Sequence, residues 1–157
     1  MVSLAMERAL QFLRSHKDVA LATSKDNIPK LRIFQVMKQE GNVLYFATSE
    51  KKAVWRELRK NPNVELIAYE GNISVRCSGM VNFNVEDATK RWIYEHRSAE
   101  GRLQVKNDVL RRLYPSYDQM AYFCLPIAEM DYYDLQPTPP EMLHFDLMAG
   151  KVTSNLI

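Results

Sequence analysis

The sequence predicts a mainly β protein in which an antiparallel, barrel-like sheet is flanked by helices. Short apolar segments with strand character are joined by tight turns, of which 40–42 and 70–72 are centred on glycine. Such short connections join antiparallel neighbours, because parallel strands need a long crossover. About six strands of this kind in one chain of 157 residues favour a closed or split barrel.

The elements follow one another from helix to strand with few long connections. Ser3 can cap a first helix whose apolar positions include Leu10 and Leu13. A second helix starts after Lys52 and stops at Asn61-Pro62, since proline ends a helix. Strands are expected at 19–23, 31–36, 43–48, 64–69, 73–83, 120–135 and 142–147, and further helices at 85–95 and 103–113.

The chain has the size of one ordinary domain. No internal repeat, low-complexity block or linker divides it. We therefore expect a single domain over 1–157. The strand at 142–147 is expected at a sheet edge, and 137–157 as a whole is expected to form a tail or a lid.

Composition excludes several classes of function. The 21 basic and 19 acidic side chains nearly balance, so a nucleic-acid-binding surface is not expected. The apolar runs are far shorter than the roughly 20 residues of a membrane span, and the early charges Glu7 and Arg8 do not fit a signal peptide. Cys77 and Cys124 lack metal-ligand spacing and are expected to be buried thiols, which makes the cytoplasm the default location.

Two segments contain residues suited to anion binding. Arg32 stands inside an otherwise apolar strand, and 46–52 runs from a strand end into a helix start rich in hydroxyls and lysines. A helix start has unpaired N–H groups and a partial positive charge, so Thr48, Ser49 and the lysines could bind a phosphate there. Arg32 could grip the same phosphate through two donors. Solvated surface lysines and a water-facing arginine are the competing interpretation.

Other reactive residues do not form a recognisable site. His16, His96 and His144 are far apart and lack the spacing of metal ligands, so no metal site is expected. The sequence also has no glycine-rich phosphate loop and no motif for a serine or cysteine nucleophile. No catalytic side chain is identified.

Four strings in order resemble one known family. They are Pro-Lys-Leu-Arg-Ile-Phe from 29, Leu-Tyr-Phe-Ala-Thr-Ser-Glu-Lys-Lys from 44, Asn-Pro-Asn-Val-Glu-Leu from 61 and Val-Arg-Cys-Ser-Gly from 75. Together with the order of elements, they are similar to the pyridoxamine 5'-phosphate oxidase-related FMN-binding split-barrel proteins. The similarity covers roughly residues 1–135. It implies an FMN-binding split β-barrel that forms a homodimer.

The resemblance also implies a role for individual residues. Arg32 and Lys52 would hold the FMN phosphate, helped by Lys51 and Ser49. Main-chain groups of Ile33, Phe34 and Gln35 would bind the polar edge of the isoalloxazine ring, and Ala47 and Thr48 would lie under the ring and ribityl chain. Ser74 would reach the flavin from the partner subunit, although the oxidases carry a longer amide side chain there.

One departure from the family limits the expected activity. The oxidases proper end in a Trp- and Arg-containing segment that grips the substrate phosphate, and no such segment follows Leu135. We expect an FMN-dependent oxidoreductase that passes electrons from a reduced nicotinamide to an unidentified small-molecule acceptor, and not a vitamin B6 oxidase. The alternatives are a non-enzymatic module that stores or senses FMN, and a split barrel that binds a deazaflavin or haem.

Overall fold

The computed structural model describes residues 3–97 and 117–155. The helices are α1 (Leu4–Ser15), α2 (Ala53–Lys60) and α3 (Asp87–His96), with a short 3-10 turn at Tyr117–Gln119. The strands are β1 (Asp18–Lys25), β2 (Ile28–Gln35), β3 (Lys38–Glu40), β4 (Val43–Ser49), β5 (Asn63–Glu70), β6 (Ile73–Met80), β7 (Met120–Pro126), β8 (Glu129–Asp134), β9 (Glu141–Asp146) and β10 (Lys151–Ser154). The helix expected at 103–113 lies outside the described residues.

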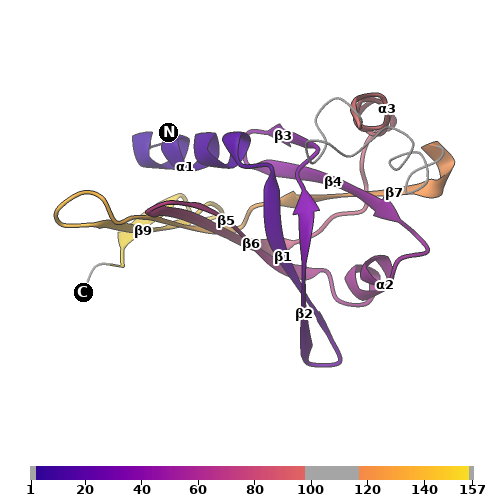
Figure 1. The fold of residues 1–157 in the computed structure, drawn as a ribbon, viewed down its shortest axis with the longest axis horizontal. Coiled ribbons are helices and arrows are strands. Elements are labelled where there is room, and N and C mark those ends of the chain that lie inside the picture. Colours follow the sequence, from indigo (N-terminus) through magenta and orange to yellow (C-terminus); the bar gives the residue numbers. More distant parts are fainter. Residues whose placement is uncertain (1–2, 98–116, 156–157) are drawn as a thin grey trace.

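The strands form two antiparallel sheets. Seven strands are ordered β10-β9-β8-β6-β5-β1-β2, and three are ordered β3-β4-β7. Figure 1 shows α1 and α3 on the upper side of the sheets, and α2 beside the β1–β2 hairpin at the lower right. The sheets do not close into one barrel, which confirms the predicted split-barrel, mainly β fold with flanking helices. Within the described ranges, no helix is long and apolar enough to cross a membrane.

Local sequence signals account for the first elements. Ser3 caps α1, with its hydroxyl accepting a hydrogen bond of 3.1 Å from the Met6 amide. The β3–β4 turn places Gly41 at a φ of 58°, a left-handed conformation that glycine adopts without strain. Pro29 lies in β2, the edge strand of the seven-stranded sheet. An edge strand tolerates a residue without an N–H group, because it pairs with a neighbour on one side only.

The prediction of one strand over 120–135 is wrong. The chain forms β7 in the small sheet, bends at residues 126–128, and continues as β8 in the large sheet. At the bend, the Ile127 amide donates a hydrogen bond to the Asn42 carbonyl oxygen, and the Ala128 amide donates one to the Ser78 carbonyl oxygen, both at 2.9 Å. β6 passes so close that a Cβ on Gly79 would lie 2.8 Å from the Pro126 carbonyl oxygen. A glycine is therefore required where the two sheets separate.

Aromatic packing joins the two sheets. Phe34 of the large sheet meets Phe46 and Phe123 of the small sheet edge-on, with ring centroids 5.8 and 5.7 Å apart. Phe46 and Phe123 are stacked at 5.1 Å, and both are fully buried. Large aromatic groups in such geometries contribute strongly to core stability. This trio therefore fixes β2 against β4, the two strands that contain most of the predicted site.

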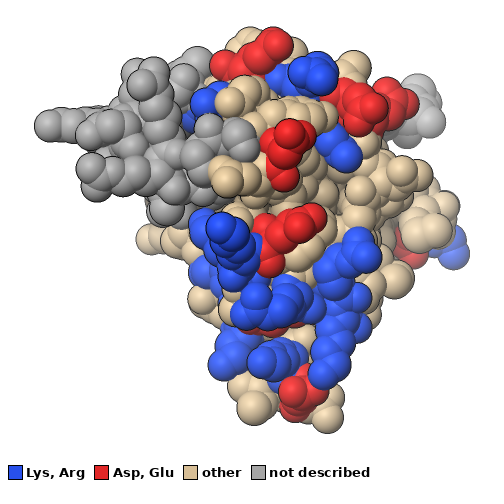
Figure 2. All heavy atoms as spheres, turned by 90° about the vertical axis from the view of Figure 1, so that its right-hand side faces the viewer, with Lys and Arg blue, Asp and Glu red and all other residues tan. Residues whose placement is uncertain are grey.

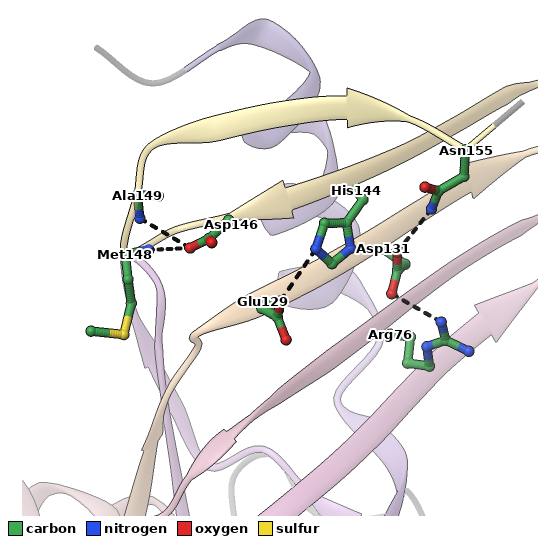
Figure 3. Close-up of polar contacts among 8 residues, drawn as sticks. All are labelled: Arg76, Glu129, Asp131, His144, Asp146, Met148, Ala149 and Asn155. Carbon is green, nitrogen blue, oxygen red and sulfur yellow. Dashed lines mark hydrogen bonds and ion pairs between the residues drawn. The ribbon is translucent and has the colours of Figure 1, made fainter.

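The C-terminal residues extend the large sheet. β9 pairs with β8, and β10 pairs with β9, so β9 is not the edge strand that the sequence suggested. A tail is also a wrong prediction for Lys151–Ser154, which form β10. The turn between them is held by Asp146, whose carboxylate accepts hydrogen bonds from the amides of Met148 and Ala149 (Figure 3).

A network of charged side chains links this hairpin to the sheet (Figure 3). His144 of β9 donates from Nδ1 to Asp131 of β8 over 2.8 Å, and its Nε2 lies 3.4 Å from Glu129. Asp131 also accepts from Arg76 of β6 at 3.0 Å and from Asn155 at 3.2 Å. The network therefore connects three adjacent strands and the residue that follows β10.

Both ends of the His144–Asp131 contact have shifted pKa values. The hydrogen bond to Asp131 raises the pKa of His144, and the opposing effect of burial is smaller. Burial raises the pKa of Asp131, but hydrogen bonds from His144 and Arg76 together outweigh it, so that the net shift is downward. Both shifts favour the charged pair.

We expect the hairpin to be most stable between about pH 4 and about pH 6.5, the ordinary pKa values of Asp and His. The contribution of His144 is complete below its unfolded pKa and is lost as pH rises through its higher folded pKa. The contribution of Asp131 is lost as pH falls through its lower folded pKa. Amide exchange of residues 142–154, corrected for intrinsic rates, should accelerate on both sides of this window. In His144→Gln the alkaline acceleration should vanish; if it persists, His144 is not its cause.

Candidate functional site

Arg32 is held at the junction between β2 and α2. Its Nη2 lies 2.9 Å from Oε1 of Glu57, and its Nη1 donates to the Thr23 hydroxyl over 3.2 Å. Thr23 in turn donates to the same Glu57 oxygen at 2.8 Å. The Arg32 side chain is 27% exposed, whereas Glu57 is only 6% exposed. A guanidinium has more N–H donors than these two contacts use, so Arg32 keeps hydrogen-bonding capacity toward solvent or a ligand.

The Glu57 carboxylate is stabilised in its charged form. Burial raises its pKa, but the hydrogen bonds from Thr23 and Arg32 and the charge of Arg32 outweigh burial, so its pKa is lowered overall. A buried charge is tolerated only when it is paired and hydrogen-bonded. Glu57 therefore fixes the position of the Arg32 guanidinium relative to α2.

Basic side chains surround this junction. Figure 2 shows that Lys and Arg gather over the lower half of the face that contains α2 and the β1–β2 hairpin. The exposed basic residues of these elements and the turn before α2 are Lys25, Lys30, Lys51, Lys52, Arg56, Arg59 and Lys60. We call this set the cationic face. It gives the region a positive potential that attracts an anion.

The turn between β4 and α2 has the geometry of a helix start. The Ser49 hydroxyl accepts from the Lys51 amide at 3.2 Å, and the Ser49 carbonyl accepts from the Lys52 amide at 3.0 Å. Lys52 is the N-cap residue of α2, and no side chain caps this end of the helix. The first turn of α2 thus adds its partial positive charge to that of the lysines.

Ala47 and Thr48 lie on opposite faces of β4. Ala47 belongs to the apolar cluster under α3, while Thr48 is almost fully buried on the other side. The Thr48 hydroxyl has no hydrogen-bond partner among the described residues. A buried hydroxyl without a partner is costly, so this strand end has unused capacity for a polar ligand group.

β2 presents its main chain at a sheet edge. It pairs with β1 on one side and is the terminal strand of the large sheet in the described residues. Along it, Phe34 points into the core, and Ile33 is exposed on the outer face. Gln35 occupies the same outer face because side chains alternate. The alternate main-chain groups that point away from β1 are those expected to bind the flavin ring.

Ser74 is not near the other predicted residues within one chain. It lies on β6, and β5 and β1 separate it from β2. Three strand spacings amount to about 14 Å. The structure therefore places Arg32 in contact with α2 through Glu57, and it places Thr48, Ser49, Lys51 and Lys52 in the strand end and turn that lead into that helix. Ser74 lies three strands away from β2.

Glu57 and Thr23 are residues that sequence reasoning missed. A signal for Glu57 exists, because Glu57 and Leu58 lie three and four residues after Val54. Residues three or four apart are neighbours on one helix face, so the pattern places an acid on the buried face of α2. A buried acid needs a cationic partner, and Arg32 was the available one.

Solved structures with the same architecture are numerous. A pyridoxamine 5'-phosphate oxidase-related, FMN-binding protein from Nostoc punctiforme is 17% identical, with a TM-score of 0.66 and coverage of 100% of this chain and 98% of that chain. PhzG from Burkholderia lata, in complex with tetrahydrophenazine-1-carboxylic acid, is 17% identical, with a TM-score of 0.73 and coverage of 97% and 90%. A heme binding protein from Mycobacterium smegmatis is 16% identical, with a TM-score of 0.60 and coverage of 84% and 55%.

The two partly joined sheets define a split-barrel protein with a cationic face at one end. A model of the pyridoxamine 5'-phosphate oxidase family matches residues 5–112. The chain belongs to the pyridoxamine 5'-phosphate oxidase family. No curated protein matches it. At identities this low, the solved structures establish the fold alone.

We expect Glu57→Gln to lower the free energy of unfolding by about 1–3 kcal/mol, because it leaves the partly buried Arg32 charge without its partner. Urea denaturation would measure this loss. Glu65→Gln is the matched control, since Glu65 pairs with Arg76 but is 53% exposed, and such surface pairs contribute about 0–1 kcal/mol. Equal losses in the two variants would contradict the assigned role of Glu57.

Proposed function

We propose that this protein binds FMN and is an FMN-dependent oxidoreductase that works as a homodimer. The observation that supports this most strongly is Arg32, which Glu57 fixes against α2, the helix that carries part of the cationic face, within the region matched by the family. The residues present fit the group in kind, since a hydroxyl without a partner among the described residues, two lysines and the start of α2 follow one another at the end of β4, and Arg32 contacts the same helix through Glu57.

The phosphate of FMN is proposed to bind at the β2–α2 junction. Arg32, Lys52 and Lys51 supply charge, and Ser49 supplies the hydroxyl of the turn before α2. Because Glu57 neutralises part of the Arg32 charge, the lysines of the helix start are needed to make the site attractive to a dianion. Charge-assisted hydrogen bonds of this kind are stronger than neutral ones.

The isoalloxazine ring is proposed to lie along β2 and the end of β4. The edge of β2 at Ile33, Phe34 and Gln35 offers main-chain donors and acceptors to the polar side of the ring. Ala47 and Thr48 face opposite sides of β4, so only one of the two side chains can lie under the ring and ribityl chain. The hydroxyl of Thr48, without a partner among the described residues, favours Thr48 for that position. Donors near the ring's N1 and O2 would stabilise negative charge there.

The outer face of the large sheet supports the proposed dimer. Leu31 and Tyr69 are 70% and 72% exposed, and Ile33 and Ile67 are also exposed. The register places Ile33, Ala20 and Ile67 side by side on this face. Exposed apolar patches of this kind mark interaction surfaces. A second copy covering the patch would also bring its Ser74 toward the flavin.

Bound FMN supplies hydride and electron transfer, which no side chain of the chain supplies. Binding and orientation by the residues above are what the chain contributes, with a reduced nicotinamide as the proposed electron donor. Residues 136–157 contain neither Trp nor Arg. This composition supports a substrate other than the vitamin B6 phosphates. A binding or sensing module without turnover is the alternative, and a lack of flavin reduction by NADH and NADPH would favour it.

We expect Arg32→Ala/Lys52→Ala to weaken FMN binding at least about a hundredfold, because two charge-assisted contacts worth about 3 kcal/mol together are lost. Titration of FMN fluorescence measures the dissociation constant. Lys60→Ala is the matched control, since Lys60 lies at the far end of the same helix and pairs with Asp26.

Arg32→Ala also leaves Glu57 buried without its partner, so the fold of the variant must be checked by circular dichroism. If it unfolds, Arg32→Lys/Lys52→Ala keeps a cation for Glu57 while removing the forked donors of Arg32. An unchanged dissociation constant in a folded double variant would exclude the assigned phosphate site.

A further inference from the structure

The positive charge of the cationic face exceeds what the proposed phosphate site uses. Two of its members, Lys51 and Lys52, belong to that site. The members not assigned to the flavin are Lys25 and Lys30 of the β1–β2 hairpin, and Arg56, Arg59 and Lys60 of α2. Lys60 lies 3.4 Å from Asp26, and within residues 3–97 and 117–155 no carboxylate forms an ion pair with the other four. The cationic face therefore keeps unbalanced charge when the phosphate site is filled.

Several cations elsewhere on the surface have carboxylate partners. Arg8 of α1 lies 2.7 Å from Glu141 of β9, and Lys38 of β3 lies 3.0 Å from Glu40. The chain as a whole carries 21 basic and 19 acidic side chains, so the excess on the cationic face results from the segregation of charge and not from a basic composition. Cations that gather in this way repel one another and attract an anionic partner.

α2 and the hairpin form one continuous surface. The Arg32–Glu57 contact of 2.9 Å joins α2 to β2, and the Lys60–Asp26 contact of 3.4 Å joins the last residue of α2 to the hairpin turn. Lys30 projects from β2 on the same side as Arg32, because side chains two residues apart on a strand share a face. The unpaired cations of both elements therefore lie on one side of the molecule, in the lower half of Figure 2.

The proposed dimer leaves this surface open. Leu31 and Ile33, which belong to the apolar patch assigned to the dimer, lie on the outer face of β2. They alternate along the strand with Lys30 and Arg32, so the cationic face lies on the opposite side of the hairpin. A partner bound to the cationic face would therefore not compete with the second copy of the chain.

Arg59 and two aromatic rings border the unpaired cations. The Arg59 guanidinium lies 4.9 Å from the centroid of the Phe83 ring and 5.8 Å from that of the Trp55 ring. The two rings meet edge-on with their centroids 5.1 Å apart, and both residues are partly exposed. Arginine and aromatic side chains are enriched in protein–protein interfaces, where they contribute much of the binding energy. This composition favours a protein as the anionic partner.

Other polyanions fit the surface less well. The exposed residues of α2 are one alanine and three cations, which provide no apolar stripe for insertion into a lipid surface. A nucleic acid carries a phosphate at every nucleotide, whereas the exposed carboxylates of Asp26 and Glu50 interrupt the cations of this face. An acidic protein segment can place its carboxylates away from those two positions.

The spacing of the cations indicates how such a segment would lie. Arg56 and Lys60 are four residues apart, which corresponds to a rise of about 6 Å along α2. Lys30 and Arg32 are two residues apart, which corresponds to about 7 Å along β2. Carboxylates on alternate residues of an extended chain are also about 7 Å apart. An extended acidic segment therefore matches the spacing on both elements.

We propose that the cationic face docks an acidic segment of a partner protein, bound in an extended conformation with carboxylates on alternate residues. Those carboxylates would pair with Lys25, Lys30 and Arg56, and an apolar side chain of the segment would pack on Trp55 and Phe83. This surface adds a protein partner to the proposed function and does not depend on the flavin.

Fluorescence anisotropy tests this proposal with a peptide of alternating Glu and Ser that carries a red-emitting dye. The wild-type protein should bind it saturably with and without FMN, and should bind a peptide of alternating Gln and Ser at least about tenfold more weakly. Lys25→Gln/Lys30→Gln/Arg56→Gln should weaken binding of the acidic peptide at least about tenfold, because three surface ion pairs are lost.

Arg14→Gln/Lys90→Gln/Lys151→Gln is the matched control, because it removes the same charge from α1, α3 and β10. Its affinity for the acidic peptide should change less than about threefold, since salt screens distant charges. Circular dichroism checks that both variants are folded. Equal weakening in the two folded variants, or no binding by the wild-type protein, overturns the docking surface. Complete displacement of the peptide by FMN also overturns it, because the peptide would then occupy the phosphate site.

Two further outcomes identify the class of partner and separate this proposal from the flavin proposal. If an oligothymidylate or a vesicle containing phosphatidylserine binds more tightly than the peptide and is weakened by the same variant, the assignment of a protein partner is overturned. Peptide binding with the expected response to the variants, by a protein that does not bind FMN, supports the docking surface and overturns the flavoprotein function.

Discussion

The buried carboxylate of Glu57 is the interaction on which the candidate site depends. It accepts hydrogen bonds from Thr23 of β1 and Arg32 of β2 while it belongs to α2, so one charge connects three elements. Because a buried carboxylate must keep its partners, α2 cannot move relative to the hairpin without a large loss of stability. The helix that begins directly after Lys51 and Lys52 is thereby held against Arg32.

Much of the fold could be predicted from local signals, and the failures have physical causes. The Ser3 cap, the glycine turns and the stop at Asn61-Pro62 depend on neighbours in sequence, and the structure has these boundaries within a few residues. The bend at 126–128 has a local signal in Pro126, and it also depends on the close passage of β6 at Gly79, which is a long-range contact. β10 was missed because its residues are exposed and form no apolar pattern.

The site was predictable as a set of residues but not as an arrangement. The motifs indicated Arg32 and Lys52, yet the pairing of Arg32 with Glu57 is a tertiary contact. Ser74 differs from these residues, because its proposed role depends on a contact with a second chain. The exposed apolar outer face extends the proposed flavin site toward a partner subunit.

The most direct test of the proposed dimeric flavoprotein is size-exclusion chromatography of the FMN-saturated protein with in-line light scattering and visible absorbance. We expect one peak with twice the mass of the chain and one flavin per chain. A monomer with bound flavin would contradict the interface site. A protein without flavin absorbance, or with the absorbance of haem after purification, would contradict the proposal that this split barrel is a flavoprotein.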